Sequence, residues 1–423
     1  MGVSPRRRDD LPRAPLELLH PLALPGGEAA GIEILAELPR REGVPLFSLF
    51  RAALSWSSGA SSGEDVGALE SHALARLAEE GCWPAAAVIA MNVAEPPGDD
   101  RDEIARACLC VADWALSQSA PSTALAFAGL AAIVWPRHPR YAWTYARLLR
   151  GSGRMREAEQ WFRRSHRIAV WLGDWEAQVK CLNSLGVLSY ITGSYRRAEG
   201  RLARALALAA KHGLHRARGE VLHDLFALEL ERQDFTRAEG YAAEAVRHYL
   251  PSHHRLPALG HDMACLWMEQ GHFARAHPLL LAVARHLDSS AEQFQTYAAA
   301  ARAAGGAGDV EGYERASAKA WEAASHFNES RTRGAALLDL ARGAASLGRW
   351  SQAIDIFEQA RAVAIGREEA DVLVKAEAGL EAARAERRAD SPARPIRPNV
   401  GVSADVVARE MIEALQPVRP MAA

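Results

Sequence analysis

The sequence predicts an all-α protein, built as a solenoid of stacked helical hairpins. A short turn motif recurs along the chain at spacings of 34 to 40 residues. Apolar residues lie at helical spacing around each turn, and no segment shows the period-2 alternation expected of a strand. Gly and Pro fall mostly at the joints between these segments, where they end helices. We therefore predict about eight repeats, with turns at positions 81, 119, 153, 193, 233, 271, 308 and 348.

The best-formed copy spans residues 185–213 and reads LGVLSYITGSYRRAEGRLARALALAAKHG. Its first helix is expected to end at Gly193, because glycine adopts the positive φ favoured at a helix C-terminus. A small residue five positions after each turn allows the two helices to approach closely. The arginines of the second helix, Arg196, Arg197 and Arg201, are expected to be solvated. The residues two positions after the turns, predicted to fill the hairpin corners, are Met155, Tyr195, Phe235, Phe273, Val310 and Trp350.

Residues 183–209, NSLGVLSYITGSYRRAEGRLARALALA, resemble a tetratricopeptide repeat. The resemblance covers roughly residues 68–387, and its 40-residue spacing is similar to the longer repeats of bacterial sensor and regulator proteins. It implies a right-handed superhelical solenoid. The chain departs from those regulators in having no GxxxxGK[ST] phosphate loop and no convincing helix-turn-helix. The family's Leu-Gly pair, turn glycine, aromatic residue and small residue are matched by Leu185, Gly186, Gly193, Tyr195 and Ala198.

The two ends of the chain do not share the repeat. Residues 1–65 carry Pro and Gly breaks around short apolar segments, and we predict short helices that cap the first repeat, with a partner-docking arm as the alternative. The repeat domain is assigned to residues 66–387, followed by a Pro/Arg-rich linker at 388–402. Residues 403–423 are predicted to form a short amphipathic helix and a tail. We expect that helix to cap the C-terminal end; the alternatives are a return into a groove or binding to another protein.

Composition limits the classes of partner. The 423 residues include 50 basic and 52 acidic side chains, a balance that argues against direct binding of nucleic acid. No stretch approaches the ~20 apolar residues of a membrane span, and the N-terminal residues lack the apolar core of a secretory signal. The five cysteines, an odd and sparse set, are typical of a reducing compartment. We therefore expect a cytoplasmic protein with no membrane partner.

Catalytic and metal motifs are missing from the sequence. The chain has fifteen histidines but neither an HExxH motif nor paired CxxC motifs. No Ser/His/Asp or Cys/His arrangement can be defended from sequence order, since such sites are recognised by their geometry. We expect no enzyme, no cofactor and no metal ion. The densest histidine group, expected to be solvated and interfacial, contains His248, His253, His254, His261, His272 and His277.

The resemblance also implies a binding surface, because the first helix of each tetratricopeptide hairpin faces the concave side of the solenoid. Residues about 13, 10, 6 and 3 positions before each turn then share one face, since steps of three or four keep one side of a helix. The early part of this column is cationic and would suit the acidic end of a peptide, and Asn183 could hydrogen-bond the peptide backbone. The predicted groove residues are Arg140, Trp143, Arg147, Arg150, Lys180, Asn183, Tyr190, Glu220, His223, His261 and Met268.

These observations support two hypotheses about function. The first is a non-enzymatic protein–protein interaction scaffold that binds a peptide segment or a partner protein in the concave groove. The alternative is a peptide- or ligand-responsive regulator whose DNA-binding or signalling output module is on another chain. Self-association stays open under both hypotheses, and the sequence does not identify the partner because one solenoid fold serves many ligands.

Overall fold

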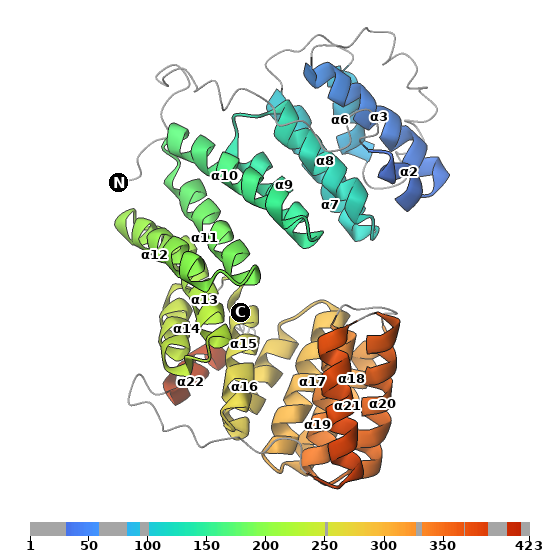
Figure 1. The fold of residues 1–423 in the computed structure, drawn as a ribbon, viewed down its shortest axis with the longest axis vertical. Coiled ribbons are helices and arrows are strands. Elements are labelled where there is room, and N and C mark those ends of the chain that lie inside the picture. The colour runs from blue at the N-terminus through green and yellow to red at the C-terminus, as the bar shows by residue number, and fades with distance from the viewer. Residues whose placement is uncertain are drawn as a thin grey trace, which may run out of the picture. The chain divides into compact units, whose positions relative to one another are not determined.

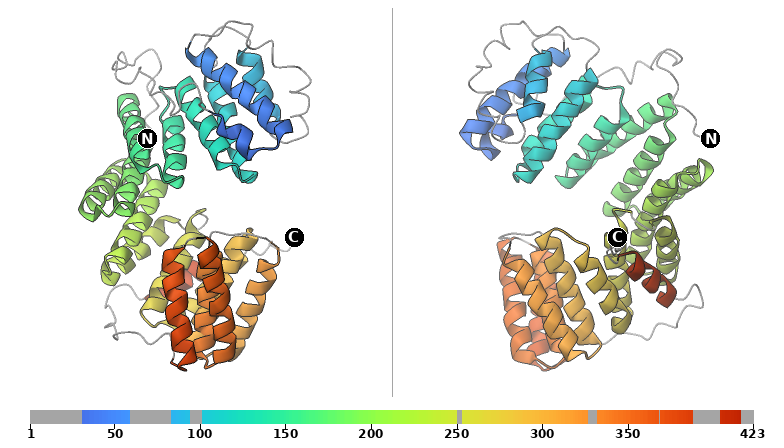
Figure 2. Two further views of the ribbon diagram at one scale, coloured as in Figure 1. Left: turned by 45° about the vertical axis from the view of Figure 1, so that its right-hand side comes forward. Right: turned by 180° about the vertical axis from the view of Figure 1, so that it is seen from behind.

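The computed structural model describes residues 31–58, 83–93, 101–249, 253–326, 332–367, 369–387 and 404–415, and within these ranges the regular elements are all helices. The chain divides into two compact units, residues 1–217 and 218–423, with the boundary inside helix α13 (His215–Glu231). Figures 1 and 2 show the helices coloured from the N-terminus to the C-terminus. No helix in the described ranges is both long and apolar enough to cross a lipid bilayer. The predicted all-α fold of stacked helical hairpins is confirmed in both units.

The first unit contains a short helix α2 and a longer helix α3, one helix that follows a gap in the described residues, and three hairpins. The hairpins pair α7 with α8, α9 with α10, and α11 with α12. Its helices are α2 (Glu33–Glu37), α3 (Arg40–Ser58), α6 (Trp83–Val93), α7 (Arg101–Ser117), α8 (Pro121–Val134), α9 (Pro139–Gly151), α10 (Met155–Leu172), α11 (Trp175–Ile191) and α12 (Tyr195–Lys211).

The second unit continues the same succession of hairpins, and each of its later first helices packs on the hairpin before it. The last helix, α22, returns to an earlier part of the unit. The helices are α13 (His215–Glu231), α14 (Phe235–Tyr249), α15 (Leu256–Glu269), α16 (Phe273–Arg285), α17 (Ser290–Gly306), α18 (Val310–Ala324), α19 (Arg333–Ser346), α20 (Trp350–Gly366), α21 (Ala370–Arg384) and α22 (Ala404–Ala414).

The predicted turns lie where the helices change direction. The seven turns from 119 to 348 all have a positive φ, including the non-glycine residues Ser119 and Gln233. In each of these hairpins the second helix begins two residues after the turn. Close helix approach also requires glycine within the hairpin: a Cβ added to Gly186 would lie 2.7 Å from the Leu202 side chain. The turn predicted at position 81 lies outside the described residues.

The residues two positions after the turns do not all fill the hairpin corners, so that prediction is wrong for two copies. Tyr195 and Val310 are 39% and 46% exposed, whereas Phe273 is buried. Each stands at the first position of the second helix, where the side chain can point past the end of the hairpin. Phe273 is covered because the next hairpin brings Gly306 against its ring, leaving no room for a Cβ at that glycine.

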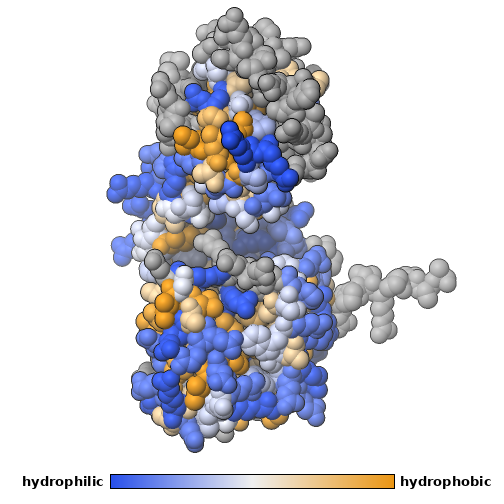
Figure 3. All heavy atoms as spheres, turned by 90° about the vertical axis from the view of Figure 1, so that its right-hand side faces the viewer, coloured by the Kyte–Doolittle hydropathy of each residue, from blue (hydrophilic) through white to orange (hydrophobic). Residues whose placement is uncertain are grey.

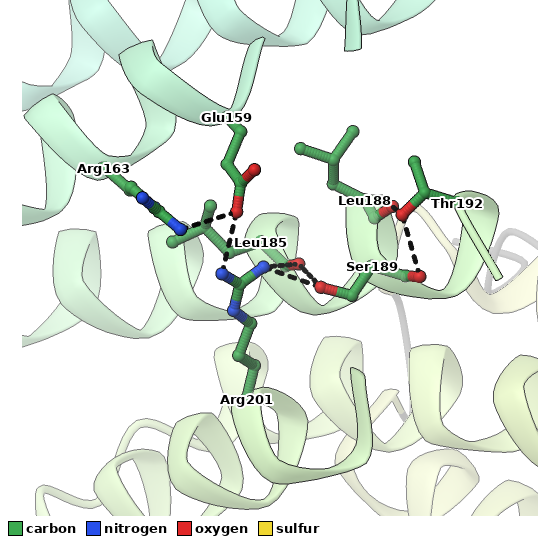
Figure 4. Close-up of polar contacts among 7 residues, drawn as sticks. All are labelled: Glu159, Arg163, Leu185, Leu188, Ser189, Thr192 and Arg201. Atoms are coloured by element: carbon green, nitrogen blue, oxygen red, sulfur yellow. Dashed lines mark hydrogen bonds and ion pairs between the residues drawn. The ribbon is translucent and has the colours of Figure 1, made fainter. Parts of the chain in front are cut away.

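Arg201 joins two hairpins of the first unit and is not solvated as predicted (Figure 4). Its guanidinium donates to the Leu185 carbonyl at 2.9 Å and to Ser189 Oγ at 2.6 Å, both on α11. It also donates to Glu159 Oε1 on α10 at 2.9 Å, and that hydrogen bond contributes most to lowering the pKa of Glu159. Its long aliphatic stem lets the charge reach inward from α12, which a count of helical positions does not reveal. Arg196 and Arg197 are exposed, as predicted.

The N-terminal helices α2 and α3 pack on the start of the hairpin array, at α6 and α8. The Glu37 carboxylate accepts hydrogen bonds from the backbone N–H groups of Ser122 and Thr123, each at 2.7 Å. Two of the N–H groups that open α8 are thereby paired. The capping role of residues 1–65 stays a prediction, because the boundary at residue 65 and the turn at position 81 both lie outside the described residues.

The C-terminal helix does not cap the last hairpin. Helix α22 packs against α14 and α16, the second helices of two earlier hairpins, as both views show (Figures 1 and 2). The sequence indicated the amphipathic character of this helix but not the face that would receive it, because the tether length permits several positions. The predicted linker at 388–402 lies outside the described residues.

Large apolar side chains remain on the surface of several helices. Met91, Ile365 and Val374 are each more than half exposed. On the face drawn in Figure 3, apolar patches are interspersed among hydrophilic side chains. Most of the apolar surface is nonetheless buried between helices, where alanine permits close packing.

Candidate peptide-binding site

A lysine lies over a tryptophan ring on the surface of the first unit. The Lys180 ammonium on α11 lies 3.9 Å from the centre of the Trp143 ring on α9. The Trp143 indole N–H donates to Ser184 Oγ at 2.8 Å, and the Ser184 hydroxyl donates to the Lys180 carbonyl at 2.9 Å. The ring orientation is therefore fixed by α11, and the ring in turn positions an exposed cation.

A hollow of about 260 Å³ opens beside this pair. Arg140, in the first turn of α9, and Lys180 contribute positive charge to its lining, and Asp174 and Glu176 contribute negative charge. Arg140, Lys180 and Glu176 are exposed, and Trp143 is half-buried. The lining of the hollow thus combines one aromatic ring with two cations and two carboxylates.

The inner side of the hollow is a neutral hydrogen-bonded chain. The buried Ser165 hydroxyl donates to the Pro139 carbonyl at 2.7 Å, and the Cys181 thiol donates to Ser165 Oγ at 3.1 Å. Burial raises the pKa of Cys181 to about 12. The thiol is therefore protonated near neutral pH, and Cys181 lacks the thiolate that a nucleophile needs.

Helix caps hold both first turns in place. His138 Nδ1 accepts the Arg140 N–H at 3.2 Å, and Asp174 Oδ1 accepts the Ala177 N–H at 2.9 Å. Burial lowers the pKa of His138, which keeps its imidazole neutral and its Nδ1 able to accept. The two caps fix the start of α9 beside the start of α11, where Arg140 and Lys180 project.

The other groove residues predicted for this unit lie further along the same two helices. The Arg147 guanidinium is 5.9 Å from the centre of the Trp143 ring, so Arg140, Trp143, Arg147 and Lys180 form one cationic and aromatic surface. Arg150, Asn183 and Tyr190 are half-buried and engaged in contacts within the protein. None of these three side chains lines the hollow, and their role in binding stays a prediction.

The groove residues predicted for the second unit form a different arrangement. His223 is 3% exposed, and its two ring nitrogens face the Tyr249 hydroxyl at 3.3 Å and Asp262 Oδ2 at 3.1 Å. His261 Nδ1 lies 3.6 Å from the other oxygen of the same carboxylate. Burial disfavours the Asp262 charge, but its contacts with His223 and His261 outweigh that effect and hold the pKa well below its usual range.

His223 and Met268 are therefore not ligand-accessible groove residues, and that part of the prediction is wrong. Both side chains are buried, Met268 to 2% exposure. Tyr249, at the end of α14, covers His223, and the last turn of α15 buries Leu266, Trp267 and Met268 together. A helical period identifies one side of a helix, but other elements decide whether that side is open.

Three residues of this unit bring potential metal-ligating atoms within 4.8 Å of one another: Glu220, His253 and His254. His253 Nδ1 accepts the Arg255 N–H at 3.1 Å, so the neutral ring carries its proton on Nε2, which faces Glu220 at 3.6 Å. A metal ion at Nε2 would need the lone pair that this tautomer lacks. His253 is also buried and stacked on Tyr249, with ring centres 4.1 Å apart, so it is an interfacial but not a solvated histidine.

Sequence reasoning missed the residues that fix the unit-one site. Ser184 and Ser165 lie on helices with no motif around them, and only their contacts in the folded chain reveal their roles. Asp174 carried a recognisable signal, because an aspartate directly before a helix is a common N-cap. The cationic column itself was found from helical spacing and from the family pattern.

A family model supports the repeat assignment for part of the chain. A family model described as tetratricopeptide repeat matches residues 139–211, which contain α9 to α12. No curated protein matches the chain. Similar solved structures include yeast Tom70, with 14% identity, 84% of each chain covered and a TM-score of 0.47. BtubC from P. vanneervenii has 20% identity over 55% of this chain and 96% of its own, with a TM-score of 0.41.

A further similar structure is the Rap conjugation gene regulator of the plasmid pLS20 in complex with the Phr* peptide. It has 14% identity, a TM-score of 0.41, and coverage of 80% of this chain and 94% of its own. The matched stretch contains the turns at Gly153 and Gly193, both with positive φ. Residues 139–211 are identified as tetratricopeptide repeats.

Proposed function

We propose that this protein is a non-enzymatic interaction scaffold that binds an acidic peptide segment on the α9–α11 surface. The observation that carries the proposal is the exposed Lys180 ammonium held 3.9 Å over the Trp143 ring, beside a hollow that Arg140 also lines. Both helices lie within the stretch that matches the tetratricopeptide-repeat model. Repeat scaffolds of this kind support protein–protein interaction in general.

The charges around the hollow predict the orientation of the peptide. A carboxylate placed between Arg140 and Lys180 would gain two charge-assisted hydrogen bonds. An adjacent apolar side chain could cover the part of the Trp143 ring that Lys180 leaves open. Glu176 and Asp174, which also line the hollow, would repel a second carboxylate. We therefore expect one acidic residue flanked by an apolar residue, rather than a long acidic run.

A peptide selection tests the proposal without a known partner. A random 12-residue phage-displayed library is selected on the immobilised full-length chain, in parallel with the variant Arg140→Glu/Lys180→Glu. The matched control is Arg156→Glu/Arg196→Glu, which makes the same charge change at exposed positions of second helices. We expect acidic–apolar peptides to be enriched on the wild type and on the control, but not on the groove variant. Equal enrichment on all three proteins would contradict the proposal.

The regulator hypothesis makes an additional claim that the same peptides can test. A selected peptide that shifts the scaffold between conformations would change the small-angle scattering curve during titration. A peptide that binds with an unchanged curve would support a scaffold alone. Either result leaves the α9–α11 binding site in place.

A further inference from the structure

We infer that the surface formed by α14, α15 and α16 is a helix-binding groove, and that α22 occupies it as an intramolecular ligand. The partner that the groove fits is an amphipathic helix with an acidic residue in its first turn and a row of small to medium apolar side chains. This surface lies in the second unit and shares no residue with the proposed α9–α11 site.

The apolar side of α22 carries the contact. Val407, Ala408, Met411 and Leu415 are all buried, with Met411 completely inaccessible. These positions follow the spacing of one helix face, and Val406 on the opposite side is 41% exposed. Hydrophobic burial on one face is the usual way in which an amphipathic helix binds a groove.

The receiving surface also includes α15. A Cβ added to Gly260 on α15 would lie 2.8 Å from the Val283 side chain of α16 and 3.4 Å from Met411 Cε, so Met411 lies in van der Waals range of α15 at this glycine. Helix α22 lies against α14 and α16 of two successive hairpins. It therefore contacts three helices, α14, α15 and α16, that belong to two successive hairpins.

One ion pair fixes the direction of the bound helix. The Asp405 carboxylate, in the first turn of α22, accepts a hydrogen bond from Arg275 Nε on α16 at 2.7 Å. A negative charge in the first turn is also favourable for the helix itself. A helix bound in the reverse direction would lose this pair while keeping its apolar face.

The intramolecular helix leaves part of the groove open. A hollow of about 780 Å³ runs between α22 and the start of α16, lined by Arg275 and Pro278 on one side and by Ala408 and Ile412 on the other. A competing helix with a larger apolar residue at the position of Ala408 would fill more of this space. That difference gives a partner a means to displace α22.

The test uses a fluorescein-labelled peptide of residues 403–416, SADVVAREMIEALQ, titrated with full-length chains. Covalent connection gives α22 a high effective concentration, so we expect the wild type to bind the peptide at least about tenfold more weakly than Val407→Asp/Met411→Asp. The matched control Val406→Asp alters the exposed side of α22 and should behave like the wild type. A peptide in which Ala408 is replaced by Leu should bind the double variant more tightly than the parent peptide.

A charge exchange supplies a second, independent measurement. In the Val407→Asp/Met411→Asp background, Arg275→Glu should lose the parent peptide and gain a peptide carrying Asp405→Arg. Circular dichroism and thermal melting of each variant establish that the hairpins remain folded. If the folded double variant fails to bind the peptide, or if the wild type binds it equally well, the inference is overturned. A wild-type dimer that exchanges α22 between copies would overturn it as well.

Discussion

Equivalent positions of the repeat have different surroundings in the two units of this molecule. On α9 and α11 of the first unit, Arg140 and Lys180 are exposed around the half-buried Trp143. On α13 and α15 of the second unit, His223 is buried in a polar cluster with Asp262 and Tyr249. Both sets of residues come from the predicted groove column. Helical spacing selects a face of the helix, while the neighbouring elements decide whether that face is exposed or buried.

The sharpest test of this difference compares the stability of two variants. His223→Leu removes the histidine that pairs with both Tyr249 and Asp262 inside the protein, and should lower the free energy of unfolding by about 2–3 kcal/mol. Lys180→Met, at the exposed site, should change it by less than about 0.5 kcal/mol. Urea unfolding followed by circular dichroism measures both. Similar values for the two variants would contradict the division into a structural cluster and a surface site.

Arg201 extends the comparison to an arginine that links two hairpins. Arg201→Met leaves Glu159 without its main partner and removes two hydrogen bonds to α11. We expect it to lower the free energy of unfolding by about 1–3 kcal/mol. Arg196→Met, on the exposed side of the same helix, is the matched control. Thermal unfolding of the two variants gives the difference. If Arg201→Met destabilises the protein no more than the control does, the hydrogen bonds of Arg201 make no net contribution to stability.

Two substitutions of Trp143 separate the role of its ring face from that of its indole N–H. Trp143→Phe keeps an aromatic face for Lys180 but loses the hydrogen bond to Ser184. We expect this loss to lower the free energy of unfolding by about 1 kcal/mol. Peptide binding should survive in this variant and be lost in Trp143→Ala, as isothermal titration with a selected peptide would show. Equal loss in both variants would assign the effect to the hydrogen bond instead of the ring.

The smallest expected effect concerns pH. Because burial lowers the pKa of His138 below its ordinary value of 6.5, the unfolded chain binds this proton more tightly than the folded chain. The stabilising contribution is therefore present above pH 6.5 and declines as the pH falls through the lowered pKa, by less than about 1 kcal/mol. His138→Asn keeps a cap acceptor without a titrating group. The difference between the melting temperatures at pH 7.5 and pH 5.5 should be smaller in this variant than in the wild type. If the difference is unchanged, His138 is not the source of the pH dependence.

Much of the fold could be predicted because each hairpin repeats a local rule. Turn spacing, the residue with positive φ and the small residue after it are all contained within about 40 residues of sequence. The long-range features could not be predicted in the same way. Arg201 reaches another hairpin through a flexible side chain, and α22 contacts α14 and α16 from far along the chain.

In the candidate site, too, the local features could be predicted and the long-range contacts could not. Arg140, Trp143 and Lys180 followed from helical spacing, but the hydrogen bond that orients Trp143 depends on Ser184 of the next hairpin. His223 and Met268 satisfied the same spacing and are buried, because residues of α14 and α15 cover them. Exposure is a property of the assembled hairpins, and a single helix does not contain it.

The central claim is that Lys180 and Arg140 form a carboxylate-binding surface, and a double-mutant cycle tests it most directly. Isothermal titration would measure a selected acidic peptide, and its Glu/Asp→Lys counterpart, against the full-length wild type and Lys180→Glu. The claim predicts that each single change weakens binding about tenfold or more and that the two changes together restore much of it. If the two changes are additive, with no recovery of affinity, Lys180 does not contact the peptide carboxylate and the claim is wrong.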